Sequence, residues 1–217
     1  MRLERWTGIT GLVLLGSVIA GIVGETMGPN VSMNPPQMYD SFKTANTAVL
    51  VAGSFLLVQK VVLVGFAAGL ATLVARGEKE PLLSRVVFGA GMLQVAITMI
   101  YVATYVAVAT IVTQLTAPIV FGLFTVGESF DLAGMPFLGL MVAVASSGLA
   151  RSRVLPRWLG RFGMVAGGLL MLGSFSLLAP QGFFLMLPLL LGVLLVVVWL
   201  LIVNIALIRV RPPAAPA

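Results

Sequence analysis

Lys60 is a charged residue inside a long apolar segment, Ala48–Ala75, in which Gln59 is the other strong interruption of the hydrocarbon. A lysine near the middle of a membrane span is costly, so it usually faces protein or trapped water and has a partner. Such a residue either pairs with an anion inside the protein or helps to bind a solute. Alternatively, its long stem lets the ammonium group snorkel to the outer interface.

Glu25 is the expected partner of Lys60. At a rise of about 1.5 Å per residue, Lys60 lies about 22 Å from the end of its apolar segment. On the same rise, Glu25 lies about 25 Å from the start of its own segment, so adjacent antiparallel helices would bring the two together. Tyrosines and glutamines at comparable depth extend this group. The predicted intramembrane polar residues are Lys60, Glu25, Gln59, Gln94, Tyr101 and Tyr105.

A pair of acidic residues, Glu128 and Asp131, lies three residues apart in what the sequence presents as an outer loop. A carboxylate pair can bind a cation or exchange protons with a substrate. A solvated acidic loop is the simpler interpretation, and the sequence leaves both open.

The residue types that are missing exclude much chemistry. The chain has no Cys and no His. Thiolate nucleophiles, iron–sulfur clusters, cysteine or histidine zinc sites and histidine-ligated haem are therefore excluded, as is the commonest general base. No catalytic motif is recognisable among the remaining side chains. We therefore expect a protein that is not an enzyme, and we assign no catalytic residue, metal or cofactor.

The composition indicates the class of protein that positions these residues. Of 217 residues, 59% are hydrophobic and only 9% are charged, against about 25% charged in a soluble domain. Apolar stretches of about 20 residues or more are long enough to cross a bilayer as helices. We predict a single polytopic membrane domain over residues 1–217, folded as an all-α bundle.

The apolar stretches predict six transmembrane helices. Their approximate bounds are Gly8–Glu25, Ala48–Ala75, Val86–Val112, Leu132 or Met135 to Ala150, Phe162–Ala179, and Phe183–Ile208. A further apolar piece, Ala117–Gly127, is too short to span. It is expected to be a re-entrant or interfacial segment, or an extension of the third helix broken at Pro118.

The basic residues predict the orientation. With six spans, 11 of the 13 basic residues fall on one face, and the positive-inside rule makes that face cytoplasmic, with both termini inside. This asymmetry explains the net charge of +6 without a nucleic-acid partner. The alanine-, valine- and arginine-rich composition suggests a bacterium with a GC-rich genome, and hence its inner membrane.

An arginine-rich connection lies between the fourth and fifth spans. Arg157 and Arg161 are one helical turn apart, and Trp158 favours the membrane interface. We expect Arg153, Arg157 and Arg161 to contact anionic lipid headgroups on the cytoplasmic face.

Small residues recur every four positions in several spans, which lets helix backbones approach closely. The rows are Gly16–Ala20–Gly24, Gly65–Gly69, Gly139–Ala143–Ser147 and Gly163–Gly167. Such faces serve either the chain's own bundle or contact with a protein partner or a second copy.

Three short segments resemble a family of small bacterial integral membrane proteins of unknown function. They are Ser152–Gly160 (SRVLPRWLG), Arg5–Gly11 (RWTGITG) and Phe130–Gly134 (FDLAG). The resemblance implies a polytopic fold and carries no catalytic residue, substrate or cofactor.

Two functions are consistent with these features. The first is a non-catalytic module, which would act as an accessory subunit, sensor or interaction partner in a membrane assembly. The alternative is a small transporter or a bundle that binds a lipid or small molecule through the region of Lys60 and Glu25.

Overall fold

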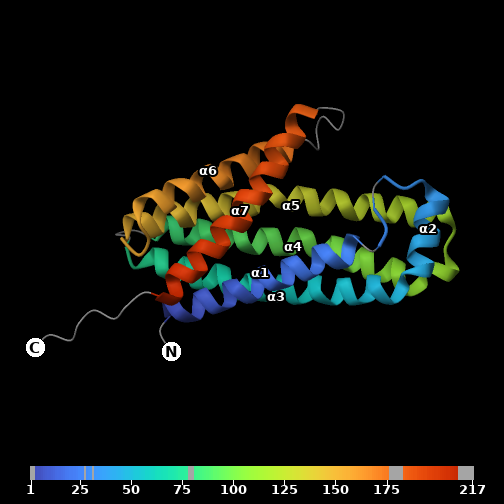
Figure 1. The fold of residues 1–217 in the computed structure, drawn as a ribbon, viewed down its shortest axis with the longest axis horizontal. Coiled ribbons are helices and arrows are strands. Elements are labelled where there is room, and N and C mark those ends of the chain that lie inside the picture. Colours follow the sequence, from blue (N-terminus) through green and yellow to red (C-terminus); the bar gives the residue numbers. More distant parts are fainter. Residues whose placement is uncertain (1–2, 27, 31, 78–80, 176–182, 210–217) are drawn as a thin grey trace, which may run out of the picture.

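The computed structural model describes residues 3–26, 28–30, 32–77, 81–175 and 183–209, without the side chains at 22, 24–26 and 183–186. Every regular element in these residues is a helix (Figure 1). The elements are α1 (Leu3–Thr26), α2 (Pro35–Thr44), α3 (Asn46–Ala75), α4 (Leu82–Ile111), the short 3-10 helix η1 (Val112–Gln114), α5 (Ala117–Arg151), α6 (Arg157–Ser174) and α7 (Phe183–Arg209).

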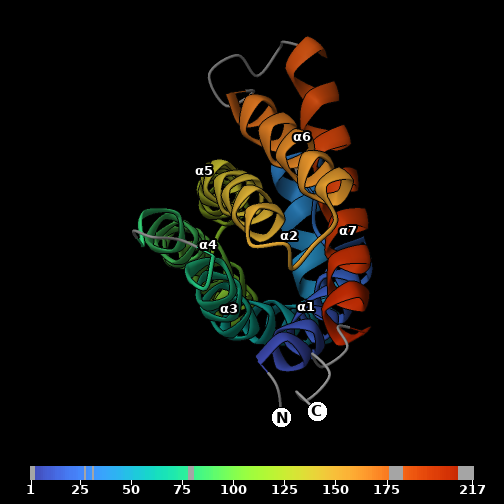
Figure 2. The ribbon, with the colours of Figure 1, turned by 90° about the vertical axis from the view of Figure 1, so that its left-hand side faces the viewer.

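The six long helices form a closed ring. Each helix contacts the next in the order α1, α3, α4, α5, α6, α7, and α7 contacts α1 again. Figure 2 looks along the bundle and shows these helices arranged around its axis. A polar side chain that points inward from any of the six therefore has other helices of the chain around it.

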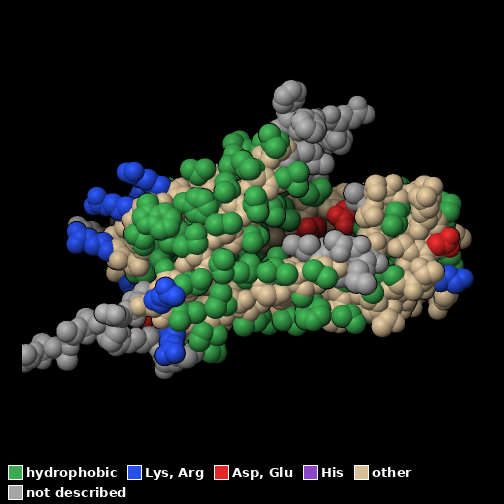
Figure 3. All heavy atoms as spheres, viewed as in Figure 1, with side chains coloured by type: hydrophobic (Ala, Val, Ile, Leu, Met, Phe, Trp, Pro, Cys, Tyr) green, Lys and Arg blue, Asp and Glu red, His purple; other side chains and the backbone are tan. Residues whose placement is uncertain are grey.

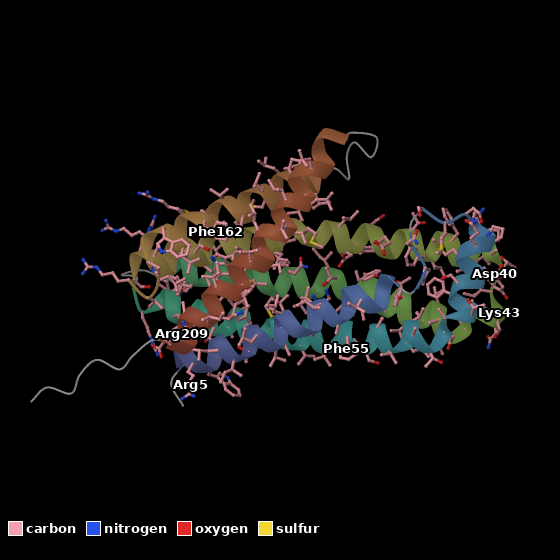
Figure 4. The ribbon with its side chains drawn as sticks, in the orientation of Figure 1. Arg5, Asp40, Lys43, Phe55, Phe162 and Arg209 are labelled. Carbon is pink, nitrogen blue, oxygen red and sulfur yellow. The ribbon has the colours of Figure 1, made fainter. Side chains whose placement is uncertain are left out.

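The two ends of the bundle differ in charge. The end where α1 begins and α7 ends (Figure 1), here called the basic end, carries a cluster of Lys and Arg side chains (Figure 3). Arg5 and Arg209 lie there, whereas Asp40 and Lys43 lie on α2 at the opposite end, here called the distal end (Figure 4). Both ends of the described chain are therefore at the basic end.

Five helices are long and apolar enough to cross a membrane. These candidate spans are Leu3–Gly21, Asn46–Ala75, Leu82–Gln114, Ala117–Arg151 and Leu187–Arg209. Their lengths and compositions indicate an all-α membrane protein. The helix α6 is the remaining member of the ring. Because Arg157 and Arg161 occupy its first two turns, α6 is less apolar than the others, and a sixth span stays a prediction.

The interpretation of Ala117–Gly127 as a re-entrant, interfacial or broken piece is wrong. These residues form the first turns of α5, a continuous helix of 35 residues. Thr116 is extended and Pro118 follows at the helix start, where a missing backbone N–H leaves no carbonyl unpaired. At about 1.5 Å per residue, α5 is about 52 Å long. Glu128 and Asp131 consequently lie within a helix and not in an outer loop.

The polar connection between the first two spans contains a helix, α2, that the sequence analysis missed. Asn34 and Gln37 form a capping box at its start, and Pro35 occupies the first turn. Its buried residues are Met38 and Phe42, and the Phe42 ring packs edge-on against Tyr105 at a centroid distance of 5.8 Å. The helix α2 thus covers the distal end of the bundle.

The bundle contains two separate hydrophobic clusters along its length. One lies toward the basic end and includes Phe66, Val87 and Met141. The other lies under α2 and includes Leu56, Tyr105 and Phe124. On each of α3, α4 and α5 the gap between the clusters is marked by a polar residue. These residues are Lys60, Gln94 and Asp131.

Close backbone contact joins α5 to α6. A Cβ atom added at Gly139 would lie 2.6 Å from the carbonyl oxygen of Gly167, and one added at Gly167 would overlap the carbonyl oxygen of Gly139. The small-residue rows of these two helices therefore pack the chain's own bundle. In contrast, Gly16 and Gly65 face outward, because a Cβ atom added at either position would have no neighbouring atom within 4 Å.

Substitution of adjacent glycines on α6 tests this packing. We expect Gly167→Ala to destabilise the protein by about 1–3 kcal/mol, because the added methyl group overpacks the α5–α6 contact. Gly168 has open space around it, so Gly168→Ala should leave stability unchanged or slightly higher. Reversible unfolding in mixed detergent micelles measures both. Equal losses for the two variants would show that α5 and α6 do not approach this closely.

Candidate functional site

A cavity of about 250 Å³ lies inside the ring, between the two hydrophobic clusters. All six long helices contribute to its wall. Its polar lining consists of Gln59 and Lys60 from α3, Gln94 and Tyr101 from α4, and Asp131 from α5. The apolar lining is Val18, Leu56, Met135, Leu138, Leu170, Val193, Val196, Val197 and Leu200. In Figure 3, acidic side chains are visible in a hollow at mid-length of this face.

Lys60 points into the interior of the bundle. Its side chain is only 5% exposed and lines the cavity. The half-buried carboxyl group of Asp131 lines the same cavity and interacts electrostatically with Lys60. A basic and an acidic side chain therefore line one cavity from α3 and α5, and these two helices contact each other across the ring.

Glu25, the partner expected from the sequence, has its side chain outside the described residues, so the Glu25–Lys60 pair stays a prediction. Asp131 is also among the residues predicted from the sequence, where it was expected in an outer loop. The spacing of Gly127, Asp131, Gly134 and Leu138 is three or four residues. This is the spacing of one helix face, and it could have indicated that Asp131 points inward with its apolar neighbours.

Two amide oxygens in the cavity have no hydrogen-bond partner among the described residues. They are Oε1 of Gln59 and Oε1 of Gln94. The Gln94 side chain is 3% exposed. A buried acceptor without a donor lowers the stability of the protein by about 1–3 kcal/mol. Both oxygens could therefore accept a hydrogen bond from an N–H or O–H group of a molecule bound in the cavity.

Gly134 makes room for the amide of Gln94. A Cβ atom at position 134 would lie 2.7 Å from Oε1 of Gln94. Two residues later, Pro136 lies inside α5 and has no N–H to donate to the carbonyl of Leu132. Next to Asp131, Gly134 thus leaves space for a neighbouring side chain, and Pro136 leaves a backbone carbonyl of α5 without its helical hydrogen bond.

The remaining predicted polar residues divide between the cavity and the distal cluster. Tyr101 lines the cavity, whereas Tyr105 is buried in the distal cluster, where its ring lies 5.7 Å from that of Tyr101. Glu128 is half-buried on α5, one turn before Asp131, and does not line the cavity. Of the predicted acidic pair, only Asp131 belongs to this site.

A second set of buried polar atoms, which the sequence analysis did not identify, lies nearer the basic end. Thr7 Oγ1, Ser146 Oγ, Trp199 Nε1 and the Asn204 amide have no hydrogen-bond partner in the described structure. They pack against glycines: Thr7 against Gly69, Asn204 against Gly11, and both Ser146 and Trp199 against Gly163. We interpret them as contacts between helices, since none of them lines the cavity.

The predicted lipid-contacting arginines lie together on the surface of the basic end. Arg153, Arg157 and Arg161 line one groove, and Arg151 is a fourth member that the sequence analysis did not single out. Among the described residues, no group of three or more Asp, Glu, His or Cys residues could hold a metal ion.

Comparison with known protein families gives one match, and it covers most of the chain. A family model described as "Domain of unknown function (DUF4386)" matches residues 9–203. Comparisons with curated proteins and with solved structures found no match. The matched region contains every residue that lines the central cavity.

The electrostatic pairing of Lys60 with Asp131 can be tested by removing the charges singly and together. Lys60→Met or Asp131→Asn alone should cost about 3 kcal/mol, because each leaves a buried charge uncompensated. The double variant should recover most of that loss. Unfolding in detergent measures all three variants, with Lys43→Met and Asp40→Asn as exposed controls. Strictly additive effects of the two substitutions would contradict the pairing.

Proposed function

The chain belongs to the DUF4386 family, and because that description assigns no activity, we propose from the cavity that the protein binds a small polar solute inside its helix bundle. The observation that carries the proposal is the buried, unpartnered Oε1 of Gln94 in a cavity that also holds opposite charges. Small transporters need such a site, because a solute that crosses a bilayer must find its hydrogen-bond partners inside the protein.

The polar lining defines the chemistry of the solute. The acceptors are the carboxyl group of Asp131 and the two glutamine oxygens, which fit an ammonium group or another N–H donor. Lys60 offers donors that fit a carboxylate. The solute is therefore an amine or a small zwitterion, and the apolar wall accommodates a short alkyl group.

The volume limits the size of the solute. A cavity of about 250 Å³ is several times larger than the roughly 30 Å³ that one water occupies in the liquid. A compound with the size of a small amino acid therefore fits this space. The function that we propose is thus binding, and by extension transport, of small amines or zwitterions.

The proposed setting is a bacterial inner membrane, with both termini in the cytoplasm and no catalytic activity. The clustering of arginines at the basic end supports this orientation through the positive-inside rule.

A second candidate is an accessory, sensor or interaction module in a membrane assembly. The outward-facing Gly16 and Gly65 favour it, because small residues on the lipid-facing surface allow another helix to approach. A partner or a second copy of the chain would be detected by native mass spectrometry from mild detergent. A monomer without associated chains would count against this candidate.

Gln94→Leu separates solute binding from folding. The substitution removes a buried acceptor without a partner, so stability should be unchanged or higher. Binding of radiolabelled glycine or methylammonium to the purified protein should weaken tenfold or more. Gln114→Leu, at an exposed position in η1, is the matched control and should bind as the unmodified protein does. If the unmodified protein binds neither probe, or if Gln94→Leu binds both equally well, the proposal fails.

A further inference from the structure

A groove of about 480 Å³ at the basic end, between the end of α5 and the start of α6, is lined by four arginines. They are Arg151, Arg153, Arg157 and Arg161, and the other lining residues are Ser147, Ala150 and Met164. Among the residues that the structure describes, no carboxylate lines the groove. Among the described residues, none of the four arginines forms an ion pair, although Arg76 at the same end of the bundle pairs with Glu4.

This concentration of positive charge is unfavourable for the protein alone. Arg157 and Arg161 lie in the first two turns of α6, where the helix dipole already presents partial positive charge. The first turn contains no acidic residue, and no side chain caps it. An anion in the groove would offset the repulsion among the four guanidinium groups.

The loop between α5 and α6 holds one of these arginines in an unfavourable conformation. Arg153 has a φ of 57°, the left-handed region in which glycine is usual after a helix. Its N–H donates to the carbonyl of Ala150 (3.4 Å), and the N–H of Val154 donates to that of Leu149 (3.1 Å). These bonds form the Schellman end of α5 and fix the backbone of Arg153 at the groove.

The adjacent surface of α6 is suited to an acyl chain. Val165 and Leu172 are each 58% exposed. They follow Arg161 at helical spacing on one face, with Gly168 between them, where there is open space. If a lipid headgroup bound in the groove, its acyl chains would therefore lie along this apolar stripe of α6, which faces the hydrocarbon. Trp158, exposed at the start of α6, lies where the membrane interface would be.

We propose that this groove is a specific site for the phosphate group of an anionic lipid. Guanidinium groups bind phosphate oxygens in bidentate pairs, and a phosphate between several arginines neutralises them together. The apolar stripe favours a lipid over free phosphate as the source of the group. The proposal is independent of the central cavity and stands or falls separately from it.

The main test compares two double variants that remove the same charge. Arg157→Gln/Arg161→Gln removes two arginines of the groove, whereas Arg5→Gln/Arg85→Gln removes two exposed arginines outside it. Native mass spectrometry measures cardiolipin and phosphatidylcholine retained by each purified protein. We expect the unmodified protein and the Arg5/Arg85 variant to retain cardiolipin in preference to phosphatidylcholine. The amount of cardiolipin retained by the Arg157/Arg161 variant should be at least tenfold lower. Equal loss in both double variants would overturn the site in favour of diffuse attraction.

A second variant keeps the test decisive if the glutamine variant does not fold. Arg153→Gly removes the backbone strain of a left-handed conformation at position 153, so the thermal stability of this variant should be equal to or higher than that of the unmodified protein. The amount of cardiolipin that the variant retains should fall severalfold. Unchanged retention would contradict the site.

Competition by inorganic phosphate distinguishes an anionic lipid from free phosphate as the source of the bound phosphate group. Displacement of cardiolipin only at phosphate concentrations far above those of the lipid supports the lipid, whereas displacement at equal concentration would overturn the lipid assignment.

Discussion

A lysine charge inside an apolar bundle is tolerated only where the protein itself replaces water, and this constraint organises the middle of the structure. Lys60 and Asp131 attract each other from α3 and α5 in one cavity. Around them the two hydrophobic clusters separate, and a layer of glutamine, tyrosine and acidic side chains fills the gap. The ring of six helices surrounds this layer, and acidic side chains remain visible in a hollow of one face (Figure 3).

The polar layer also explains the irregular features of α5. Gly134 leaves space for the Gln94 amide, and Pro136 leaves one carbonyl without its helical donor. Both features lie within five residues of Asp131. In a helix whose only task was to span the membrane, an acidic residue, a glycine and a proline so close together would weaken the span without compensation. Their position at the cavity wall is consistent with a site for a solute.

Much of the architecture could be predicted from residue type and spacing, because apolar length and arginine position are local properties. The depth of Lys60 and the arginine-rich loop were recognisable in this way. The identity of the facing anion was not, because it depends on how α5 packs against α3. Asp131 was assigned to a loop since Ala117–Gly127 alone is too short to span. The amphipathic α2 was missed although Asn34, Pro35 and Gln37 carry a helix-start signal.

The central claim is that positions 60 and 131 lie close together inside the bundle, and the absence of native cysteine makes this proximity directly measurable. A Lys60→Cys/Asp131→Cys variant should be joined by a short bifunctional thiol reagent within one chain, as detected by intact mass. The matched pair Val61→Cys/Asp131→Cys, in which position 61 is 74% exposed on the outer face of α3, should not be joined. Cross-linking of the Val61 pair in place of the Lys60 pair would contradict the account.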